Sequence, residues 1–463
     1  MLVDSIFTDG LAQVAYLIAD EAARTAAVID PRRDIDAYLT WANERRLTIG
    51  AILETHVHAD FVSGARELAA ATGAPIAAGH FGDQAFVDRP LADGDEIAVG
   101  RLRLRALWTP GHTPEHLAYL LIDPEAGPEP VALCSGDALF VGEVGRPDLL
   151  GPAETQRLAA QLYETVSGRL TRLENDLVVY PGHTAGSPCG KKIGAAKQTT
   201  IGQEKLTNYA FQARSKQQFI EMVLAGMPQP PTSYPTLKWI NKAGPSLLRD
   251  LPAGEPLTPR EAESALASGA LPIDTRTPDA FGGGHIPGAI SVGLDDRFLP
   301  WLGWLAPYDR DLVLLLADDA QFAAAQTLLR RIGLDRVRGY LSGGIAAWRE
   351  SGRALATLSQ ITVSDLAGKL AASADAPLVL DVRDDAEWAS GHIAGAVHRF
   401  AGEIAQGAAP PLNGARDIAV VCGSGYRSSV AASLLQARGV CGLRNVAGGM
   451  AAWLDAKLPI VTA

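Results

Sequence analysis

The segment Glu-Thr-His-Val-His-Ala-Asp-Phe, residues 54–61, directly follows the apolar stretch Ala51–Leu53. Such a stretch predicts a buried strand, so His56 and His58 stand just beyond a strand end and project in the same direction. Imidazole nitrogen is a common ligand of iron and zinc. This segment therefore predicts a metal site at the edge of an α/β sheet.

Three further strand ends are followed by residues of the same kind. His112 lies in the turn Thr-Pro-Gly-His-Thr, Asp137 follows the apolar stretch 131–133, and His183 follows the stretch 177–180. Binding sites of open α/β sheets form where such strands end. A single histidine is more often an ordinary buried polar residue, but four sites in this order predict a metal centre.

These motifs resemble the metallo-β-lactamase family, whose pattern is His-x-His-x-Asp-His, a Gly-His-Thr turn, an Asp and a Gly-His. The resemblance covers residues 1–254 and implies an αββα sandwich. Phe61 departs from the pattern, which has a histidine at this position. In members with two metal ions that histidine helps to hold the second ion, so Phe61 favours a single ion.

Within this family the chain looks most like the persulfide dioxygenases. The resemblance implies one Fe(II) per chain, bound by His56, His112 and Asp137. Two imidazoles and one carboxylate leave open positions on Fe(II) for O₂ and a sulfur substrate. His58, Asp60 and His183 are then expected either to orient the ligands or substrate, or to be polar residues of the cleft without a role.

Four other residues are candidates for contact with the substrate. Arg146 is expected either to pair with an anionic substrate or to form a structural ion pair. Cys189 is either a thiol near the iron or a packing residue. Seven of the nine lysines, including Lys191 and Lys192, lie between residues 191 and 242. They form either a solvated helix face or a rim that attracts a small anion.

The C-terminal part of the chain contains an internal repeat. Ile-Asp-Thr-Arg at 273–276 and Gly-His-Ile-Pro-Gly-Ala at 284–289 recur, with changes, 107 residues later (381 − 274). Short apolar strands alternate with helical patterns in both copies, which predicts two α/β domains with parallel sheets, 255–357 and 358–463. The Pro-rich stretch 227–235 is expected to interrupt any helix and to lead towards the first copy.

Only the second copy contains a candidate nucleophile. Cys422 lies in a Gly-containing loop between a buried strand and a helix, a setting that stabilises a thiolate, and Arg427 adds a cation at the rim. This copy resembles rhodanese, a sulfurtransferase that carries sulfane sulfur as a cysteine persulfide. The first copy has Ala317 and Phe322 at these positions. We therefore expect it to be inactive and to serve as a spacer or docking surface.

The charge, the apolar stretches and the cysteines of the chain argue against several classes of partner and location. The net charge of −11 argues against nucleic-acid binding. No stretch approaches the roughly 18 apolar residues of a membrane helix, and residues 1–5 do not resemble a secretory signal, which predicts a cytoplasmic protein without a membrane partner. The four cysteines are too few and too scattered for a disulfide framework.

The resemblances imply a dioxygenase that uses O₂ to oxidise a low-molecular-weight thiol persulfide, of the glutathione or coenzyme A type, to sulfite. Cys422 would then form or use thiosulfate. One alternative is a thioester hydrolase of the glyoxalase II type with two metal ions. Another is a non-enzymatic persulfide carrier or sensor. The sequence leaves open whether the chain is a monomer or a homo-oligomer.

Overall fold

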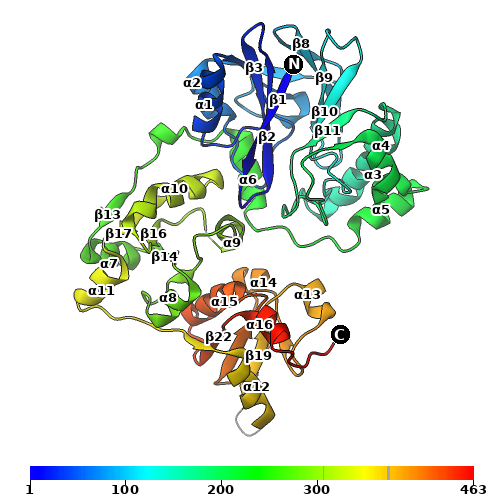
Figure 1. The fold of residues 1–463 in the computed structure, drawn as a ribbon. Helices are drawn as coiled ribbons and strands as arrows, with labels where there is room; N and C mark the ends of the chain where they lie inside the picture. Colours follow the sequence, from blue (N-terminus) through cyan, green and yellow to red (C-terminus); the bar gives the residue numbers. More distant parts are fainter. Residues whose placement is uncertain (306, 373–375, 463) are drawn as a thin grey trace. The chain divides into compact units, whose positions relative to one another are not determined.

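The computed structural model describes residues 1–305, 307–372 and 376–462 (Figure 1). The chain divides into two compact units. The first contains Met1–Leu251 with Arg330–Gly333, and the second contains Pro252–Leu329 with Leu334–Ala463. The predicted three-domain division, with boundaries after residues 254 and 357, stays a prediction.

The first unit is built on two six-stranded sheets. One has the order β1-β2-β3-β4-β5-β6, with β1 (Leu2–Thr8), β2 (Gln13–Asp20), β3 (Thr25–Ile29), β4 (Thr48–Leu53), β5 (Ile76–Gly79) and β6 (Arg89–Leu91). The other has the order β12-β11-β10-β9-β8-β7, with β7 (Glu96–Val99), β8 (Leu102–Trp108), β9 (Leu117–Ile122), β10 (Pro130–Gly136), β11 (Val178–Pro181) and β12 (Thr199–Thr200). The α-helices are α1 (Asp36–Arg45), α2 (Ala65–Thr72), α3 (Pro152–Gly168), α4 (Ile201–Thr207), α5 (Lys216–Leu224) and α6 (Tyr234–Ala243).

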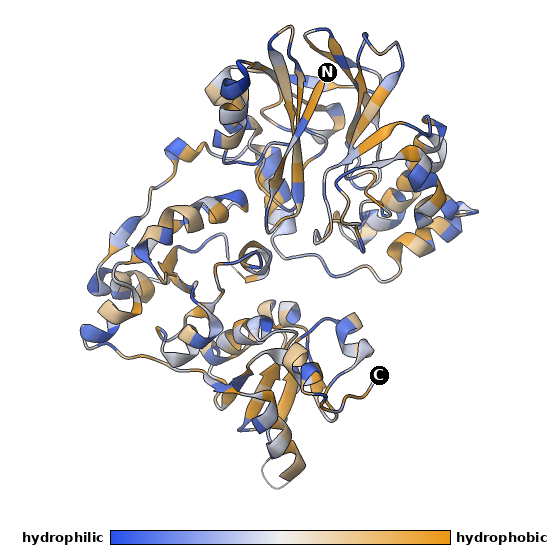
Figure 2. Ribbon diagram, viewed as in Figure 1, coloured by the Kyte–Doolittle hydropathy of each residue, from blue (hydrophilic) through white to orange (hydrophobic). Residues whose placement is uncertain are grey.

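Strand β2 shows why these sheets stack with helices outside. Val14, Tyr16 and Ile18 belong to a core shared with the second sheet, whereas Ala15 and Leu17 belong to a core shared with α1 and α2. A third core joins the second sheet to α3 and α5. Hydrophobic residues accordingly recur along the strands in Figure 2. The predicted αββα sandwich is confirmed.

The second unit contains two five-stranded parallel sheets with equivalent strand orders, β13-β17-β16-β14-β15 and β18-β22-β21-β19-β20. The first copy contains β13 (Glu255–Leu257), α7 (Pro259–Ala267), β14 (Leu271–Asp274), α8 (Pro278–Gly283), β15 (Ile290–Ser291), α9 (Phe298–Leu305), β16 (Leu312–Leu315), α10 (Phe322–Arg331), β17 (Val337–Leu341) and α11 (Gly344–Glu350). The second contains β18 (Ser359–Ile361), α12 (Val363–Ala372), β19 (Leu378–Asp381), α13 (Asp385–Ser390), β20 (Val397–His398), α14 (Ala401–Ala405), β21 (Ile418–Val421), α15 (Tyr426–Ala437), β22 (Leu443–Val446) and α16 (Gly449–Asp455). The predicted pair of α/β domains with parallel sheets is confirmed.

None of the helices in the described part of the chain has the length and apolarity needed to cross a bilayer. The cytoplasmic location stays a prediction.

Candidate functional site

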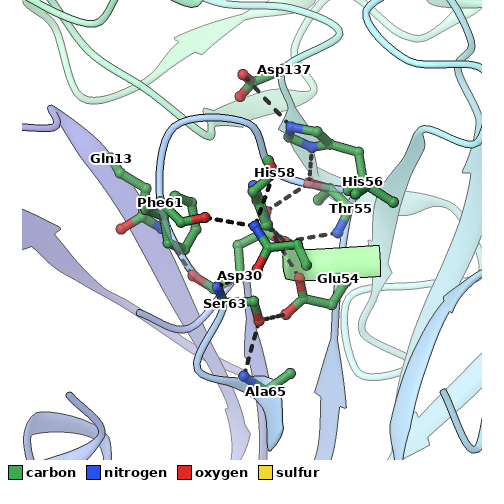
Figure 3. Close-up of polar contacts among 12 residues, drawn as sticks. Gln13, Asp30, Glu54, Thr55, His56, His58, Phe61, Ser63, Ala65 and Asp137 are labelled. Atoms are coloured by element: carbon green, nitrogen blue, oxygen red, sulfur yellow. Dashed lines mark hydrogen bonds and ion pairs between the residues drawn. The ribbon is translucent and has the colours of Figure 1, made fainter. Parts of the chain in front are cut away.

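Three side chains of the first unit bring one ligand atom each to the same buried point, and two of them, His56 and Asp137, are drawn in Figure 3. His56, His112 and Asp137 follow β4, β8 and β10, and each is at most 2% exposed. Oδ2 of Asp137 lies 3.9 Å from Nε2 of His56 and 3.5 Å from Nε2 of His112. Within the described residues these three atoms have no hydrogen-bond partner. Buried polar atoms are normally paired, so this donor set fits a metal ion that contacts all three.

The opposite nitrogens of both imidazoles are held by the protein. Nδ1 of His56 lies 2.8 Å from Oγ1 of Thr55, whose proton goes to Asp30, so the imidazole N–H donates to Thr55. Nδ1 of His112 donates to the carbonyl oxygen of Arg146, 2.9 Å away. Burial lowers the pKa of His56 and lowers that of His112 to about 4. Both rings are therefore neutral, with Nε2 available to a metal.

His58 points away from this cluster, although it is only two residues from His56. Its Nε2 lies 3.1 Å from Oδ1 of Asp30 and 3.3 Å from Oε2 of Glu54. Burial alone would lower the pKa of His58, but the two carboxylates raise it well above its usual value. The ring of Phe61 packs against the imidazole, with 4.3 Å between centroids. His58 is thus paired with carboxylates beside the candidate metal centre (Figure 3).

His183 joins the remaining oxygen of Asp137 to Asp60. Its Nδ1 lies 2.8 Å from Oδ1 of Asp137, and its Nε2 lies 2.8 Å from Oδ2 of Asp60. Burial opposes protonation of His183, but the two carboxylates raise its pKa to about 10. The Cys189 thiol belongs to the same buried cluster, and burial raises its pKa well above the usual value. The structure therefore places a cationic imidazole and a neutral thiol next to the three-ligand cluster.

The second unit presents a separate candidate site around Cys422. This residue follows β21, is fully buried, and receives hydrogen bonds at Sγ from the Gly425 N–H at 3.1 Å and the Ser428 hydroxyl at 3.3 Å. Arg427 lies in the first turn of α15 and forms two hydrogen bonds with Glu387, at 2.5 and 2.6 Å. The loop thus surrounds the sulfur with donors, while the charge of Arg427 is balanced by a carboxylate.

In the equivalent loop of the first copy, the side chain of Asp319 bonds the neighbouring segment 342–343. Asp319 accepts hydrogen bonds from the Gly343 N–H at 3.1 Å and the Ser342 hydroxyl at 3.2 Å. In both copies the imidazole of the Gly-His-Ile motif, His285 or His392, stacks on an aromatic ring and bonds a backbone carbonyl. The stacking and the carbonyl contact are thus common to both copies, whether or not a cysteine is present.

Known families match both parts of the chain. The metallo-β-lactamase superfamily matches residues 8–183, and the rhodanese-like domain matches residues 258–351 and 362–456. A crystal structure of a metallo-β-lactamase from Staphylococcus aureus subsp. aureus COL is 34% identical, with a TM-score of 0.67 over 74% of this chain and 98% of that chain. The chain belongs to the metallo-β-lactamase superfamily. Two rhodanese-like domains follow the metallo-β-lactamase domain.

Other relatives match mainly the metallo-β-lactamase domain. A hydroxyacylglutathione hydrolase from Polaromonas sp. is 37% identical over 40% of this chain and 66% of its own length. The structure of ETHE1 from Myxococcus xanthus is 30% identical, with a TM-score of 0.46, over 52% of this chain and 99% of that chain. The chain spans 60–66% of the length of three curated relatives that it matches.

Two of the predicted substrate contacts have their polar groups bound within the metallo-β-lactamase domain. Arg146 is fully buried, and its guanidinium bonds Asp148 and the carbonyl oxygens of Pro188 and Pro228. Nζ of Lys191 donates to two carbonyl oxygens at the end of α5. These contacts support the structural ion pair for Arg146 and a helix-capping contact for Lys191. Lys192 is exposed, and its backbone N–H donates to Glu143.

The residues that orient the ligands were not predicted from the sequence motifs. Thr55 and Asp30 hold His56, and Nε2 of His116 accepts the Asp137 N–H at 3.0 Å. Thr55 and His116 lie inside the quoted motifs or next to them, so their closeness to the predicted ligands along the chain was the available signal. Nothing local marks Asp30 as their partner.

Helix α6 was also missed, and it packs on the His-x-His loop. Tyr234 packs with Ala59, and the Asn241 amide donates to the carbonyl oxygens of His58 at 2.9 Å and Phe61 at 2.7 Å. Lys238 lies between Tyr234 and Asn241 on the same helix face, since residues four and three positions apart are neighbours. Burial lowers its pKa, while Glu115 favours the charged form. In addition to burial, this lysine lowers the pKa of His56 and of His112, so it lies near two of the candidate metal ligands.

Proposed function

We propose that the metallo-β-lactamase domain is a persulfide dioxygenase using one Fe(II) per chain, and that Cys422 transfers sulfane sulfur. The observation that carries the proposal is the set of three unpartnered ligand atoms on His56, His112 and Asp137. His58 and His183 are paired with carboxylates beside that set, which favours one ion over two.

His56, His112 and Asp137 would hold Fe(II), which would supply the redox chemistry between a sulfur substrate and O₂. The overall reaction converts R–S–SH, O₂ and H₂O into R–SH, SO₃²⁻ and two protons. The outer sulfur is oxidised, and O₂ is reduced by four electrons. Thr55 and the Arg146 carbonyl orient the two imidazoles, while His183 bonds one oxygen of Asp137 and leaves the other available. Burial of the cluster limits access of water to the reacting sulfur.

A glutathione-type thiol is our preferred substrate class, with a coenzyme A-type thiol as the second choice. Relatives of the metallo-β-lactamase domain are named hydroxyacylglutathione hydrolases, which supports a glutathione-containing substrate for this domain. Lys238, which lies near His56 and His112, is a candidate contact for an anionic substrate. The exposed Lys192 is a second candidate contact at the edge of the domain.

At the second site the Cys422 thiolate would attack the outer sulfur of a second R–S–SH, whose S–S bond breaks to release R–S⁻, and this sulfur would then be joined to the sulfite product. The sulfur lone pair of sulfite attacks the outer sulfur of the Cys422 persulfide, the S–S bond breaks, and its electron pair stays on Sγ. The products are thiosulfate and the Cys422 thiolate. The Gly425 N–H and the Ser428 hydroxyl both donate to Sγ and would stabilise the developing charge. Fusion of the domains would raise the local concentration of the shared sulfite.

Two variants of the full chain, reconstituted with Fe(II), test the proposal. We expect one iron per chain and O₂ uptake with glutathione persulfide. His112→Ala is expected to abolish O₂ uptake and to spare sulfur transfer from thiosulfate to cyanide, whereas Cys422→Ser is expected to do the reverse. Loss of both activities with either variant would contradict two independent sites.

A thioester hydrolase of the glyoxalase II type is the second candidate, because curated relatives bear the name hydroxyacylglutathione hydrolase. Phe61 and the carboxylate-paired His58 count against its second metal ion. Two metal ions per chain and thioester hydrolysis without O₂ uptake would favour it. Absence of turnover at saturating O₂ would instead support a persulfide carrier or sensor.

A further inference from the structure

The first rhodanese-like copy contacts the helix that begins at the Cys422 loop. Both copies belong to the same compact unit, and β15 of the first copy packs against α15 of the second. Ser291 bonds the Ser429 hydroxyl at 2.9 Å through its side chain and the Ser433 hydroxyl at 3.0 Å through its N–H. All three serines are at most 2% exposed. The contact between the two copies therefore includes a buried hydrogen-bond network of three serines.

Tyr426, the first residue of α15, is held by the same segment of the first copy. Its hydroxyl donates to the Gly293 carbonyl oxygen at 2.9 Å, and the side chain is 4% exposed. A Cβ atom at position 293 would lie only 3.2 Å from Cε2 of the tyrosine ring. A larger residue at position 293 would therefore require the ring to shift by a few tenths of an ångström.

Arg297 extends the contact onto the loop itself. Its guanidinium carbon lies 4.0 Å from the centroid of the Tyr426 ring, and its Nη1 donates to the Ser424 hydroxyl at 3.1 Å. Asp295 binds the other edge of the guanidinium, and Asp296 lies 3.9 Å from its Nε. The two carboxylates balance the positive charge of Arg297. This residue is therefore better placed to hold the loop than to attract an anion.

These contacts flank both donors to the reactive sulfur. Gly425 lies between Ser424 and Tyr426, and Ser428 directly precedes Ser429. We infer that the inactive copy positions the Cys422 loop, with Arg297 as the positioning residue, so that the Gly425 N–H and the Ser428 hydroxyl point at Sγ. This inference rests on the proposed sulfur transfer at Cys422. The first copy is then part of the sulfur-transfer site, which neither a spacer nor a docking surface would be.

The inference predicts a separation of kcat from KM. Negative charge develops on Sγ as the S–S bond breaks, so misdirected donors weaken stabilisation of the transition state more than binding of the substrate. Removing a direct donor of this kind typically costs about 100-fold or more in kcat. Because Arg297 acts through the loop, we expect a smaller loss, about 10-fold.

The test uses the full chain with thiosulfate as donor and cyanide as acceptor. Arg297→Ala is expected to lower kcat about 10-fold and to change the KM for thiosulfate less than about twofold. Arg297→Lys keeps a cation over the Tyr426 ring and is expected to recover part of the loss. Tyr426→Phe, which removes the bond to Gly293, is expected to lower kcat in the same way. Arg336→Ala, which removes an exposed ion pair of the first copy, is the matched control and should keep wild-type values.

Three results would overturn the inference. An increase in KM with unchanged kcat would mean that Arg297 binds the sulfur anion directly. Unchanged kcat and KM in both Arg297→Ala and Tyr426→Phe would mean that the contact does not affect the loop. Equal losses in Arg297→Ala and Arg336→Ala would indicate a general loss of folding. Absence of transfer in the wild-type chain, or full transfer in Cys422→Ser, would instead overturn the proposed function.

Discussion

Replacing Thr55 by valine isolates the contribution of a ligand-orienting hydroxyl to metal binding. Valine keeps the shape of the side chain but removes the acceptor of the His56 N–H and the donor to Asp30, two bonds of 2.8 Å each. Loss of such an outer contact typically weakens metal affinity about 10–100-fold, which corresponds to about 1.4–2.8 kcal/mol. We expect Thr55→Val to raise the Fe(II) dissociation constant within this range, measured anaerobically by competition with a chelator.

Thr109→Val is a closely matched control for this experiment. The Thr109 hydroxyl is buried and lies 2.8 Å from Nδ1 of His116, so the same change is made at the same distance. Nε2 of His116 accepts the Asp137 N–H and is not available to a metal. We expect the Fe(II) dissociation constant of the Thr109→Val variant to change less than about threefold. Equal effects of both variants, or no effect of Thr55→Val, would refute His56 as an oriented ligand.

Three further predictions concern charged residues. Burial opposes ionisation of Glu387, but its hydrogen bonds with Arg427 lower its pKa to about 2. The ion pair therefore stabilises the fold at pH values above the ordinary pKa of 4.5, and this stabilisation is lost as the pH falls towards 2. Glu387→Gln is therefore expected to lower the Tm at pH 7 but not at pH 2, and equal shifts at both values would contradict this. Lys191→Met removes two hydrogen bonds to carbonyl oxygens at the end of α5. It should lower the free energy of unfolding by about 1 kcal/mol and leave the KM for the persulfide unchanged. A raised KM would instead indicate that Lys191 binds the substrate. Lys238→Met removes the cation near the ligands and should raise the persulfide KM about 10-fold in O₂-uptake assays, whereas an unchanged KM would exclude contact with the substrate.

The fold was predictable because its signals are local or repeat along the chain. The strand predicted at 51–53 is the end of β4, and the apolar stretch 131–133 lies within β10. Helix α6 was missed because the Pro-rich stretch was expected to interrupt any helix. Pro235 instead occupies the first turn of α6, where the missing N–H costs no hydrogen bond.

The amino-acid order alone determined which residues stand at strand ends and which repeat carries a thiol. It thereby grouped the histidines and the aspartate that follow four strands, and it distinguished Cys422 from Ala317. These conclusions need only the alternation of apolar strands with polar turns, a property of neighbouring residues. The choice of His56, His112 and Asp137 as the three ligands came from the resemblance to the persulfide dioxygenases, and the structure brings these three side chains together.

Tertiary structure alone decided what each polar side chain bonds. His58 turns to Asp30, 28 residues earlier, and Nζ of Lys191 bonds carbonyl oxygens 31 and 34 residues later. Arg297 reaches Ser424 across 127 residues. A buried charge or donor adopts the position that satisfies it, and its partners are brought close by the packing of whole sheets and helices, which no local spacing encodes.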